Sequence, residues 1–275
     1  MRSRHAVLAV SLLALAACGG NKTRHDGPPS GSARIPDLPG DAVPRKEPRS
    51  KYGNGPVYEV LGKRYTVMPS STGYQERGVA SWYGKKFHGN LTSNREVYDM
   101  FEMTAAHKTL PLPTYVQVRN LRTDKTIIVR VNDRGPVVHN RIIDLSYAAA
   151  IKLDMIADGT SLVEVTAINL DEPAGDRPVR QTTPPASPEA AGSGPAHPHA
   201  IFVQVGAFGE RSNAERRLRT LAQAGIDNGF IHEEAVSGRT LYRVRIGPVA
   251  DVVQYDVLVE ELASIGITDP YLITD

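Results

Sequence analysis

The chain has 275 residues, of which 32 are basic and 30 acidic, so its formal net charge is +2. Such a small charge gives no electrostatic argument for a nucleic-acid partner, whereas a hydrophobic content of 41% is enough to build buried cores. The single cysteine, Cys18, excludes an intramolecular disulfide and any metal site built from several cysteines.

The first 17 residues have the layout of a secretory signal. Arg2 and Arg4 precede an apolar run over residues 6–17, which is too short for an ordinary membrane-spanning helix. Residues 15–18, with the sequence LAAC, resemble the bacterial lipobox. This resemblance implies that the peptide is cleaved before Cys18 and that the cysteine is acylated. The alternative is a soluble export signal in which the cysteine is incidental.

Gly19 follows the cysteine at the place where an aspartate would favour retention in the inner membrane. The resemblance therefore implies an outer-membrane anchor, with the protein facing the periplasm. Residues 18–50 are rich in proline, glycine and serine and predict a disordered tether. Residues 51–74 are interpreted as an N-terminal extension of the module that follows.

Residues 75–170 break into short apolar-alternating runs separated by turns, which predict strands. Residues 120–125 supply a hairpin turn, and residues 145–153, with three consecutive alanines, predict a helix. Many short strands with so little helix indicate a small β-barrel. The clearest alternating runs are 79–83, 115–118, 127–131 and 161–166.

Polar side chains concentrate between these runs. They are Glu96, Asp99, His107, Asp133 and Asp144. Three of them have an ordinary structural explanation: Asp133 is placed to cap a turn, Asp144 to cap a helix, and His107 to be a satisfied buried histidine. Asp144 also follows two isoleucines and so emerges from a buried strand, where desolvation raises the pKa of a carboxyl group. Such a carboxyl holds a proton near neutral pH.

A series of motifs in this module resembles the rare lipoprotein A (RlpA) family, in the family's order. They are ASWYG at 80–84, FHG at 87–89, EVYDM at 96–100, TAAH at 104–107, TLP at 109–111, VNDRGP at 131–136 and RIIDLS at 141–146. The resemblance implies a six-stranded double-psi β-barrel, related to that of expansins. It also implies a lytic transglycosylase that cleaves peptidoglycan strands lacking stem peptides.

A lytic transglycosylase breaks the β-1,4 bond between MurNAc and GlcNAc by letting the MurNAc 6-hydroxyl attack its own C1, so that no water attacks. One carboxyl group can protonate the leaving oxygen and deprotonate that hydroxyl. The resemblance implies that Asp144 is this acid. It also implies that Glu96, Asp99 and His107 are a cluster of polar residues associated with activity.

Trp82 and Tyr83 are candidates to stack on sugar rings, with core packing as the alternative for the tryptophan, and Asp133 is a further candidate for substrate binding. The family usually has a glycine before its glutamate, where this chain has Arg95. If this position has a positive φ, an arginine there is strained, and its guanidinium lowers the pKa of Glu96. The alternative function is therefore a non-catalytic lipoprotein that only binds glycan.

Residues 171–198 are rich in proline and predict a disordered linker. Residues 199–275 predict strand, helix, strand, strand, helix and strand, the split βαβ order of ferredoxin-like and RNP-like domains. Ser212 with Glu215 predicts a capping box at the first helix, and Asp251 predicts the cap of the second.

Strict alternation along the first strand of this α+β module places Phe202, Gln204 and Phe208 on the sheet face away from the helices. Arg243 and Arg245 of the central strand share that face. An exposed sheet that carries aromatic rings, an amide and two arginines indicates a binding surface.

QVGAF at 204–208 and RVRIGP at 243–248 resemble the SPOR domain, which binds septal peptidoglycan stripped of stem peptides. The rival for this topology is an RNA-recognition domain, but the central strand lacks its aromatic pattern and an exported protein does not meet RNA. A metal hydrolase built on His88 and His107 lacks the ligand spacing typical of zinc proteins. We therefore expect a membrane-anchored, septal lytic transglycosylase with no nucleic-acid partner, metal or cofactor. The sequence identifies no protein partner.

Overall fold

The computed structural model describes residues 27–29, 37–138, 140–170, 200–236 and 238–274. The predicted signal, residues 18–26 and 30–36 of the predicted tether (Cys18 among them) and the whole predicted linker lie outside these residues. Within the described ranges, none of the helices has the length and apolar character needed to cross a bilayer.

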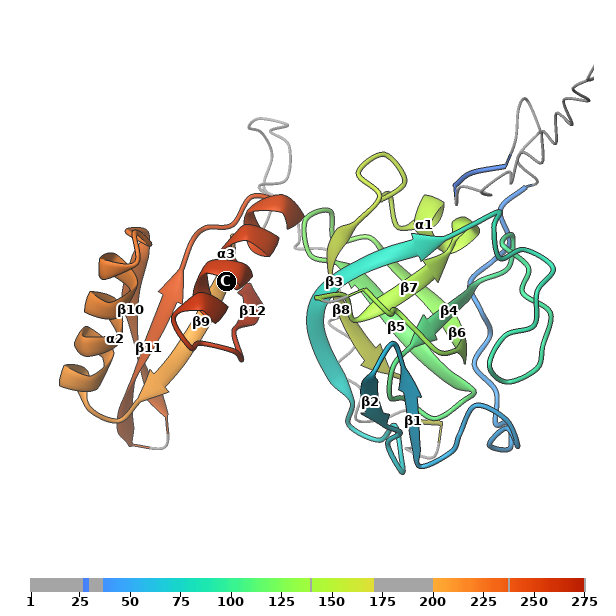
Figure 1. Cartoon of the computed structure of the whole chain (residues 1–275), viewed down its shortest axis with the longest axis horizontal. Coiled ribbons are helices and arrows are strands. Elements are labelled where there is room, and N and C mark those ends of the chain that lie inside the picture. The colour runs from blue at the N-terminus through green and yellow to red at the C-terminus, as the bar shows by residue number, and fades with distance from the viewer. Residues whose placement is uncertain (1–26, 30–36, 139, 171–199, 237, 275) are drawn as a thin grey trace, which may run out of the picture.

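Six strands close into a barrel in the order β3-β7-β4-β6-β5-β8, which confirms the predicted fold of this module (Figure 1). β3 runs parallel to β7, and β4 runs parallel to β6, while the other neighbours are antiparallel. The strands are β3 Gln75–Tyr83, β4 Thr104–His107, β5 Thr114–Asn120, β6 Thr126–Asp133, β7 Ile143–Ser146 and β8 Ser161–Ala167.

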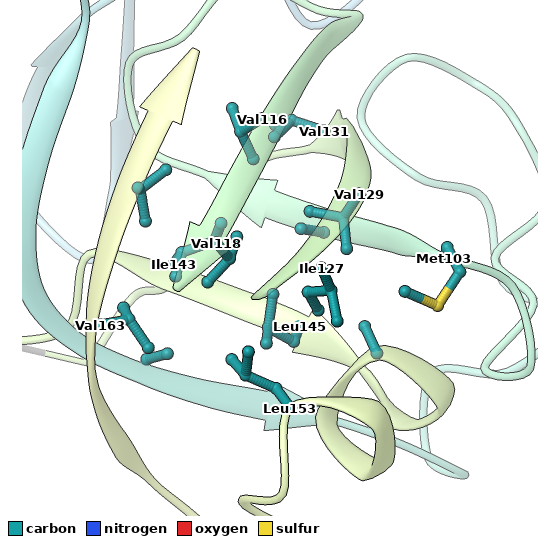
Figure 2. Packing of buried hydrophobic residues seen from close by; sticks show 14 of the residues in the cluster. Met103, Val116, Val118, Ile127, Val129, Val131, Ile143, Leu145, Leu153 and Val163 are labelled. Atoms are coloured by element: carbon teal, nitrogen blue, oxygen red, sulfur yellow. The ribbon is translucent and has the colours of Figure 1, made fainter. Parts of the chain in front are cut away.

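Alternation along the strands fills the barrel interior. In β5, Val116 and Val118 are fully buried, while Gln117 between them is exposed. Figure 2 shows these valines meeting apolar side chains from the other strands inside the barrel. Fully burying a valine, leucine or isoleucine side chain contributes about 1.5–3 kcal/mol, so this interior stabilises the frame that carries the polar loops.

One short helix and one hairpin complete the module. Helix α1, Tyr147–Lys152, directly follows β7 and is capped by the side chain of Ser146, which accepts from Ala149 N at 3.2 Å. Asp144 is therefore not the helix cap. Strands β1 (Val57–Val60) and β2 (Lys63–Thr66) form a separate hairpin from the predicted extension. It packs on the barrel, where the Tyr58 hydroxyl donates to the Lys108 carbonyl at 2.8 Å.

The C-terminal module has the predicted order of elements. Its sheet has the antiparallel order β10-β11-β9-β12. Asp251 caps α3 as predicted, with its Oδ1 accepting from Gln254 N at 2.8 Å. The predicted capping box is wrong, because α2 begins at Arg211 after Glu210 with no side-chain cap. The elements are β9 Ile201–Phe208, α2 Arg211–Gln223, β10 Gly229–Val236, β11 Arg239–Ile246, α3 Val252–Ser264 and β12 Tyr271–Thr274.

A β-bulge in this sheet overturns the predicted alternation of β9. Val244 pairs with Gly206 and Arg245 pairs with Gln204, so Val205 is an extra residue on β9. An extra residue inverts the faces beyond it. Phe208 accordingly pairs with Tyr242 on the helix side, where the guanidinium of Arg217 from α2 lies 5.9 Å from its ring centroid.

The predicted exposed face is also more closed than expected. Gln204 is only 1% exposed and donates from its amide to the Tyr271 hydroxyl, and Phe202 packs edge-to-face on Phe230. Arg243 and Arg245 lie on the face away from the helices as predicted, since Val244 between them is fully buried in the module's core.

The two modules contact each other through an ion pair. Arg141, at the approach to β7, donates from both terminal nitrogens to the carboxylate of Asp256 on α3, at 3.0 and 2.9 Å. Asn140 adds a hydrogen bond to the same carboxylate at 2.6 Å.

Candidate active site

Asp144 lies in β7 between β3 and β4. Its backbone pairs with Ser81 on one side and with Ala106 on the other. Ser81 also donates from its hydroxyl to Asp144 Oδ1. The second oxygen, Oδ2, faces the loop after β6. If Gly135 of this loop were replaced by a residue with a side chain, the new Cβ would lie 3.6 Å from Oδ2. The structure therefore holds one half-buried carboxyl group beneath a loop with a glycine at the closest point. Its predicted raised pKa stays a prediction.

Asp133 fixes the shape of this loop. Its Oδ1 accepts from the backbone N of Ser93 at 2.8 Å, from the Ser93 hydroxyl at 2.6 Å and from Arg134 N at 2.7 Å. These donors join the loop after β6 to the loop before Glu96. The arrangement matches the turn-capping explanation, and a role of Asp133 in substrate binding stays a prediction.

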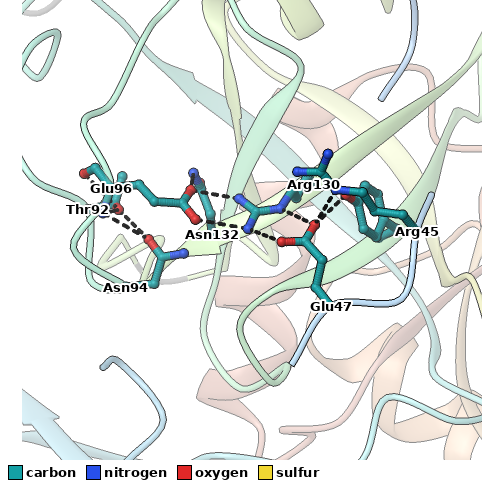
Figure 3. Close-up of polar contacts among 8 residues, drawn as sticks. Arg45, Glu47, Thr92, Asn94, Glu96, Arg130 and Asn132 are labelled. Carbon is teal, nitrogen blue, oxygen red and sulfur yellow. Dashed lines mark hydrogen bonds and ion pairs between the residues drawn. The ribbon is translucent and has the colours of Figure 1, made fainter. Parts of the chain in front are cut away.

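Glu96 is held as an ionised carboxylate. It accepts from both terminal nitrogens of Arg130 at 2.7 and 2.9 Å, and from the amide of Asn132 at 2.9 Å. Figure 3 shows Arg130 between Glu96 and a second carboxylate, Glu47. Burial alone raises the pKa of Glu96, but the bonds from Arg130 and Asn132 outweigh it, and the pKa lies below its ordinary value. A carboxylate of low pKa is a poor proton donor at neutral pH.

Arg95 has a φ of 73°, so the condition under which an arginine at this position is strained is met. It lies in a tight turn in which Arg95 N donates to Thr92 O at 2.9 Å and Thr92 N donates to Glu96 O at 2.8 Å. The prediction that the Arg95 guanidinium lowers the pKa of Glu96 is wrong. The positive charge that lowers this pKa is that of Arg130. The Arg95 guanidinium lies 5.2 Å from the ring centroid of Tyr52.

We expect Arg95→Gly to be more stable than Arg95→Ala by about 1 kcal/mol, because only glycine adopts this φ without steric cost. Both variants lose the contact with Tyr52, so their difference isolates the backbone. Urea unfolding of the two variants measures it. Equal stabilities would contradict a strained backbone at this position.

His107 is a buried neutral histidine. It is 2% exposed, and its Nδ1 accepts from Thr109 N at 3.2 Å and from Leu110 N at 3.0 Å. These bonds assign the proton to Nε2, which donates to the Tyr74 hydroxyl at 2.7 Å. Burial, reinforced by the charges of Arg134 and Lys108, lowers the pKa of His107 to about 3. The imidazole therefore stays uncharged at neutral pH, as the structural explanation expects.

Asp99 lies apart from these groups. Its side chain is 45% exposed, with Oδ1 3.5 Å from His88 Nδ1 and accepting from Phe101 N at 2.9 Å. No hydrogen bond or ion pair joins Asp99, Glu96 and His107 to one another in the described part of the chain. A shared role in activity stays a prediction. The same residues contain no group of three or more histidine, cysteine or acidic side chains that could hold a metal ion.

The two predicted stacking residues point to opposite faces of β3. Trp82 packs against the barrel interior and lies 5.5 Å from the Tyr147 ring, which matches the core alternative. Tyr83 shares the face of Ser81, but it is 8% exposed and its ring stacks on Tyr98 at 4.2 Å. Tyr98 covers one face of the Tyr83 ring, and stacking of Tyr83 on a sugar stays a prediction.

The Tyr83 hydroxyl is a separate polar feature of the site. It and the Thr104 hydroxyl are buried close together without a well-formed hydrogen bond in the described structure. Burial raises the pKa of Tyr83 well above its ordinary value, and Tyr98, Asp133 and Asp144 act in the same direction. Because this hydroxyl is buried, it adds to the polar surroundings of both carboxylates without being open to solvent.

Sequence reasoning missed Ser81 and Arg130. Ser81 stands in a motif that was quoted only for its neighbours, and its role depends on the parallel pairing of β3 with β7. Arg130 could have been identified from the sequence, because it lies between two valines of a predicted strand. An arginine that is buried in such a strand needs carboxylate partners.

The comparisons with known proteins agree with both modules. Residues 75–165 match the family model described as lytic transglycolase, and residues 198–274 match the SPOR domain. The endolytic peptidoglycan transglycosylase RlpA of Vibrio cholerae serotype O1 is 39% identical over 269 residues, which cover 96% of this chain and 94% of that protein. RlpA of Pseudomonas aeruginosa strain UCBPP-PA14 is 37% identical over 270 residues, covering 83% of this chain and 78% of that protein.

Among solved structures, the RlpA SPOR domain from Pseudomonas aeruginosa matches with 25% identity and a TM-score of 0.26, covering 26% of this chain and 96% of that one. The identity and coverage of the full-length relatives carry the assignment. The chain belongs to the RlpA family, with a lytic transglycosylase barrel followed by a SPOR domain.

Proposed function

We propose that the chain is an endolytic lytic transglycosylase that cleaves the MurNAc–GlcNAc β-1,4 bond of peptidoglycan strands lacking stem peptides. The observation that carries this proposal is the state of the four candidate groups. Glu96 is ionised by Arg130, His107 is neutral and buried, and Asp99 is exposed and apart. Asp144 remains as the one carboxyl group placed to act as an acid.

A single acid fits this reaction better than hydrolysis. A glycoside hydrolase requires a second carboxyl group, either as nucleophile or as base for a water molecule. Transglycosylation supplies the nucleophile from the substrate, so one carboxyl group beside a substrate hydroxyl is sufficient. The Arg95 guanidinium lies over Tyr52, so this departure from the family pattern gives no support to the non-catalytic alternative.

We further propose that acylated Cys18 anchors the protein to the outer membrane and that the SPOR domain delivers it to the division septum. The LAAC motif supports the anchor, and the match of residues 198–274 supports the delivery. Arg243 and Arg245 are the surface groups that best fit a polar, partly anionic glycan. Arg243, on the interior strand β11, already pairs with Glu234 of the edge strand β10.

Neutralising both arginines in Arg243→Gln/Arg245→Gln is expected to weaken binding of the full chain to amidase-treated sacculi by about tenfold, as the loss of charge-assisted hydrogen bonds predicts. Co-sedimentation with treated and untreated sacculi measures this. The control is Arg216→Gln/Arg219→Gln, which also removes two positive charges, from exposed positions of α2. Equal binding of the wild type to both kinds of sacculus would contradict a preference for stripped glycan.

A further inference from the structure

A cavity of about 370 Å³ lies between the β1–β2 hairpin and the loop after β6. Tyr58 and Tyr65 form its wall on the hairpin, and Arg134 and Gly135 form its wall on the barrel. Since Gly135 is also the residue that faces Asp144 Oδ2, the cavity adjoins the candidate acid. A volume of this size accommodates a small polar ring with its substituents.

The hairpin wall is aromatic. Tyr58 and Tyr65 are cross-strand partners whose rings stack with centroids 5.2 Å apart and planes 20° apart. Both are half-buried, so part of each ring stays accessible. The hydrogen bond from the Tyr58 hydroxyl to the Lys108 carbonyl fixes this pair against the barrel. A rigid aromatic wall is suited to the apolar face of a sugar ring, because it loses little conformational entropy on binding.

The barrel wall contains a half-buried cation without an acidic partner. Arg134 uses four of its five N–H groups on neutral acceptors, and its remaining N–H has no acceptor among the described residues. The neutral acceptors are Gly53 O, His107 O, Leu110 O and Asn54 Oδ1.

Two lysines extend this positive region from the hairpin towards Asp144. Lys63 Nζ lies 5.7 Å from the Tyr65 ring centroid, and Lys108 Nζ donates to the Arg141 carbonyl at 2.5 Å. Neither lysine is within ion-pair distance of a carboxylate in the described structure. Burial and the charge of Lys63 lower the pKa of Lys108, while the carboxylates of Glu76 and Asp144, beyond ion-pair distance, act in the opposite direction.

This absence of acidic partners is local. Elsewhere on the barrel, half-buried arginines are paired: Arg77 and Arg119 with Glu164, and Arg130 with Glu47 and Glu96. Cations that have lost part of their hydration without gaining a counter-ion favour an anionic ligand.

We infer that this cavity binds a sugar residue that carries a free carboxylate, with its ring against Tyr58 and Tyr65 and its carboxylate towards Lys63, Lys108 and Arg134. The inference rests on the proposed function, which supplies the substrate. In peptidoglycan the lactyl group of MurNAc is a neutral amide while the stem peptide is attached, and it becomes a carboxylate when the peptide is hydrolysed off. The barrel itself thereby distinguishes stripped strands from substituted ones, independently of the SPOR domain.

The experiment compares two substrates that differ only at the lactyl group, which is anionic in one and neutral in the other. Stem-free glycan strands are used either with free lactyl carboxylates or after conversion of these groups to methylamides. We expect the wild-type full chain to cleave the free-carboxylate strands with a kcat/KM about tenfold higher, equivalent to about 1.4 kcal/mol, with most of the difference in KM.

Lys63→Gln/Lys108→Gln is expected to reduce this preference to about threefold or less, because the remaining Arg134 contributes only part of the attraction. The matched control is Arg64→Gln, which removes one charge from the adjacent position of β2. Since neighbouring residues of a strand point to opposite faces, Arg64 points away from the Lys63 and Tyr65 face. The control should keep the wild-type preference.

The outcomes separate the inference from the proposed function. Equal cleavage of both substrates by the wild type would overturn the inference and leave the proposed function standing. An unchanged preference in the double lysine variant would also overturn it. Cleavage of neither substrate would contradict the proposed function, and the inference would fall with it.

Discussion

Asp144→Asn is expected to lower the release of anhydro-ended glycan products from stem-free sacculi by about 10³-fold, the usual effect of losing a general acid and base. The amide has the size of the carboxyl group and can still accept the hydrogen bond from Ser81, so the barrel should keep its structure. Chromatography of the soluble products measures the rate.

The control for this substitution is Asp158→Asn. Asp158 is an exposed aspartate of the same module whose carboxylate pairs with Arg122 at 2.7 Å. The Asp158→Asn variant should cleave at the wild-type rate. This result would show that the barrel tolerates a change from aspartate to asparagine. An Asp144→Asn variant that retained wild-type product release would rule out Asp144 as the acid.

The pH dependence of cleavage tests the same assignment. The pKa of His107 is lowered to about 3, so this histidine changes charge well below neutral pH. Its titration therefore causes no change in the cleavage rate between about pH 5 and 8. Glu96 is already ionised in that range. A fall in rate on the alkaline side of that range would therefore come from neither of these groups, and with Asp144 as the acid it should be absent from the residual activity of Asp144→Asn.

Periodicity predicted most of the barrel but not all of it. β5 and β6 alternate between apolar and polar residues, so their positions follow from the sequence. β4 was not predicted, because all four residues of its TAAH sequence are buried and the alternation signal is absent. The β1–β2 hairpin was missed because charged residues occupy most of its exposed positions.

The bulge in β9 shows the limit of the same reasoning. Alternation assigns a face to each residue only while the register is continuous, and one extra residue at Val205 moves Phe208 to the opposite face. The sequence does contain one signal for this bulge, because Gly206 follows the extra residue with a φ of 157°, and a glycine inside a strand often marks a bulge. The prediction was right for Arg243 and Arg245, whose strand keeps its alternation through Val244.

Some residues of the candidate site could be identified from the sequence and others could not. Asp144 was identified because its strand, its flanking isoleucines and its motif lie together in the sequence. The partner that keeps Arg130 in place, Glu47, lies 83 residues away in a segment interpreted as tether, and no local pattern connects the two. Long-range ion pairs of this kind are properties of the folded chain.

Arg130→Met is expected to lower the free energy of unfolding of the barrel by about 3 kcal/mol at pH 7. Its side chain is 16% exposed and binds Glu47 and Glu96, so its removal leaves two carboxylates facing each other. The cation that then remains beside Glu47 is Arg45, whose side chain is 72% exposed. The expected loss is at the lower end for a broken buried ion pair, because the Glu96 side chain is 42% exposed. Urea unfolding followed by the fluorescence of Trp82, the only tryptophan, reports on the barrel alone.

Arg122→Met provides the matched control. It removes an arginine from an ion pair of the same length, 2.7 Å to Asp158, but both side chains are about half exposed. Such a surface pair contributes less than about 1 kcal/mol. A loss in Arg130→Met no larger than the loss in Arg122→Met would contradict the structural role of the Glu47–Arg130–Glu96 network.

The difference between Arg130→Met and the wild type should also depend on pH. The hydrogen bonds from Arg130 lower the pKa of Glu47 from 4.5 to about 2 in the folded protein. A carboxyl group with a depressed folded pKa contributes stability that is fully present above pH 4.5 and is lost as the pH falls towards 2. The variant lacks the contribution of Arg130, which is the largest, while Tyr115 and Arg45 still bind Glu47, so the two stabilities should approach each other over this pH range. A gap that stayed constant down to pH 2 would show that Arg130 stabilises the barrel by packing and not by charge.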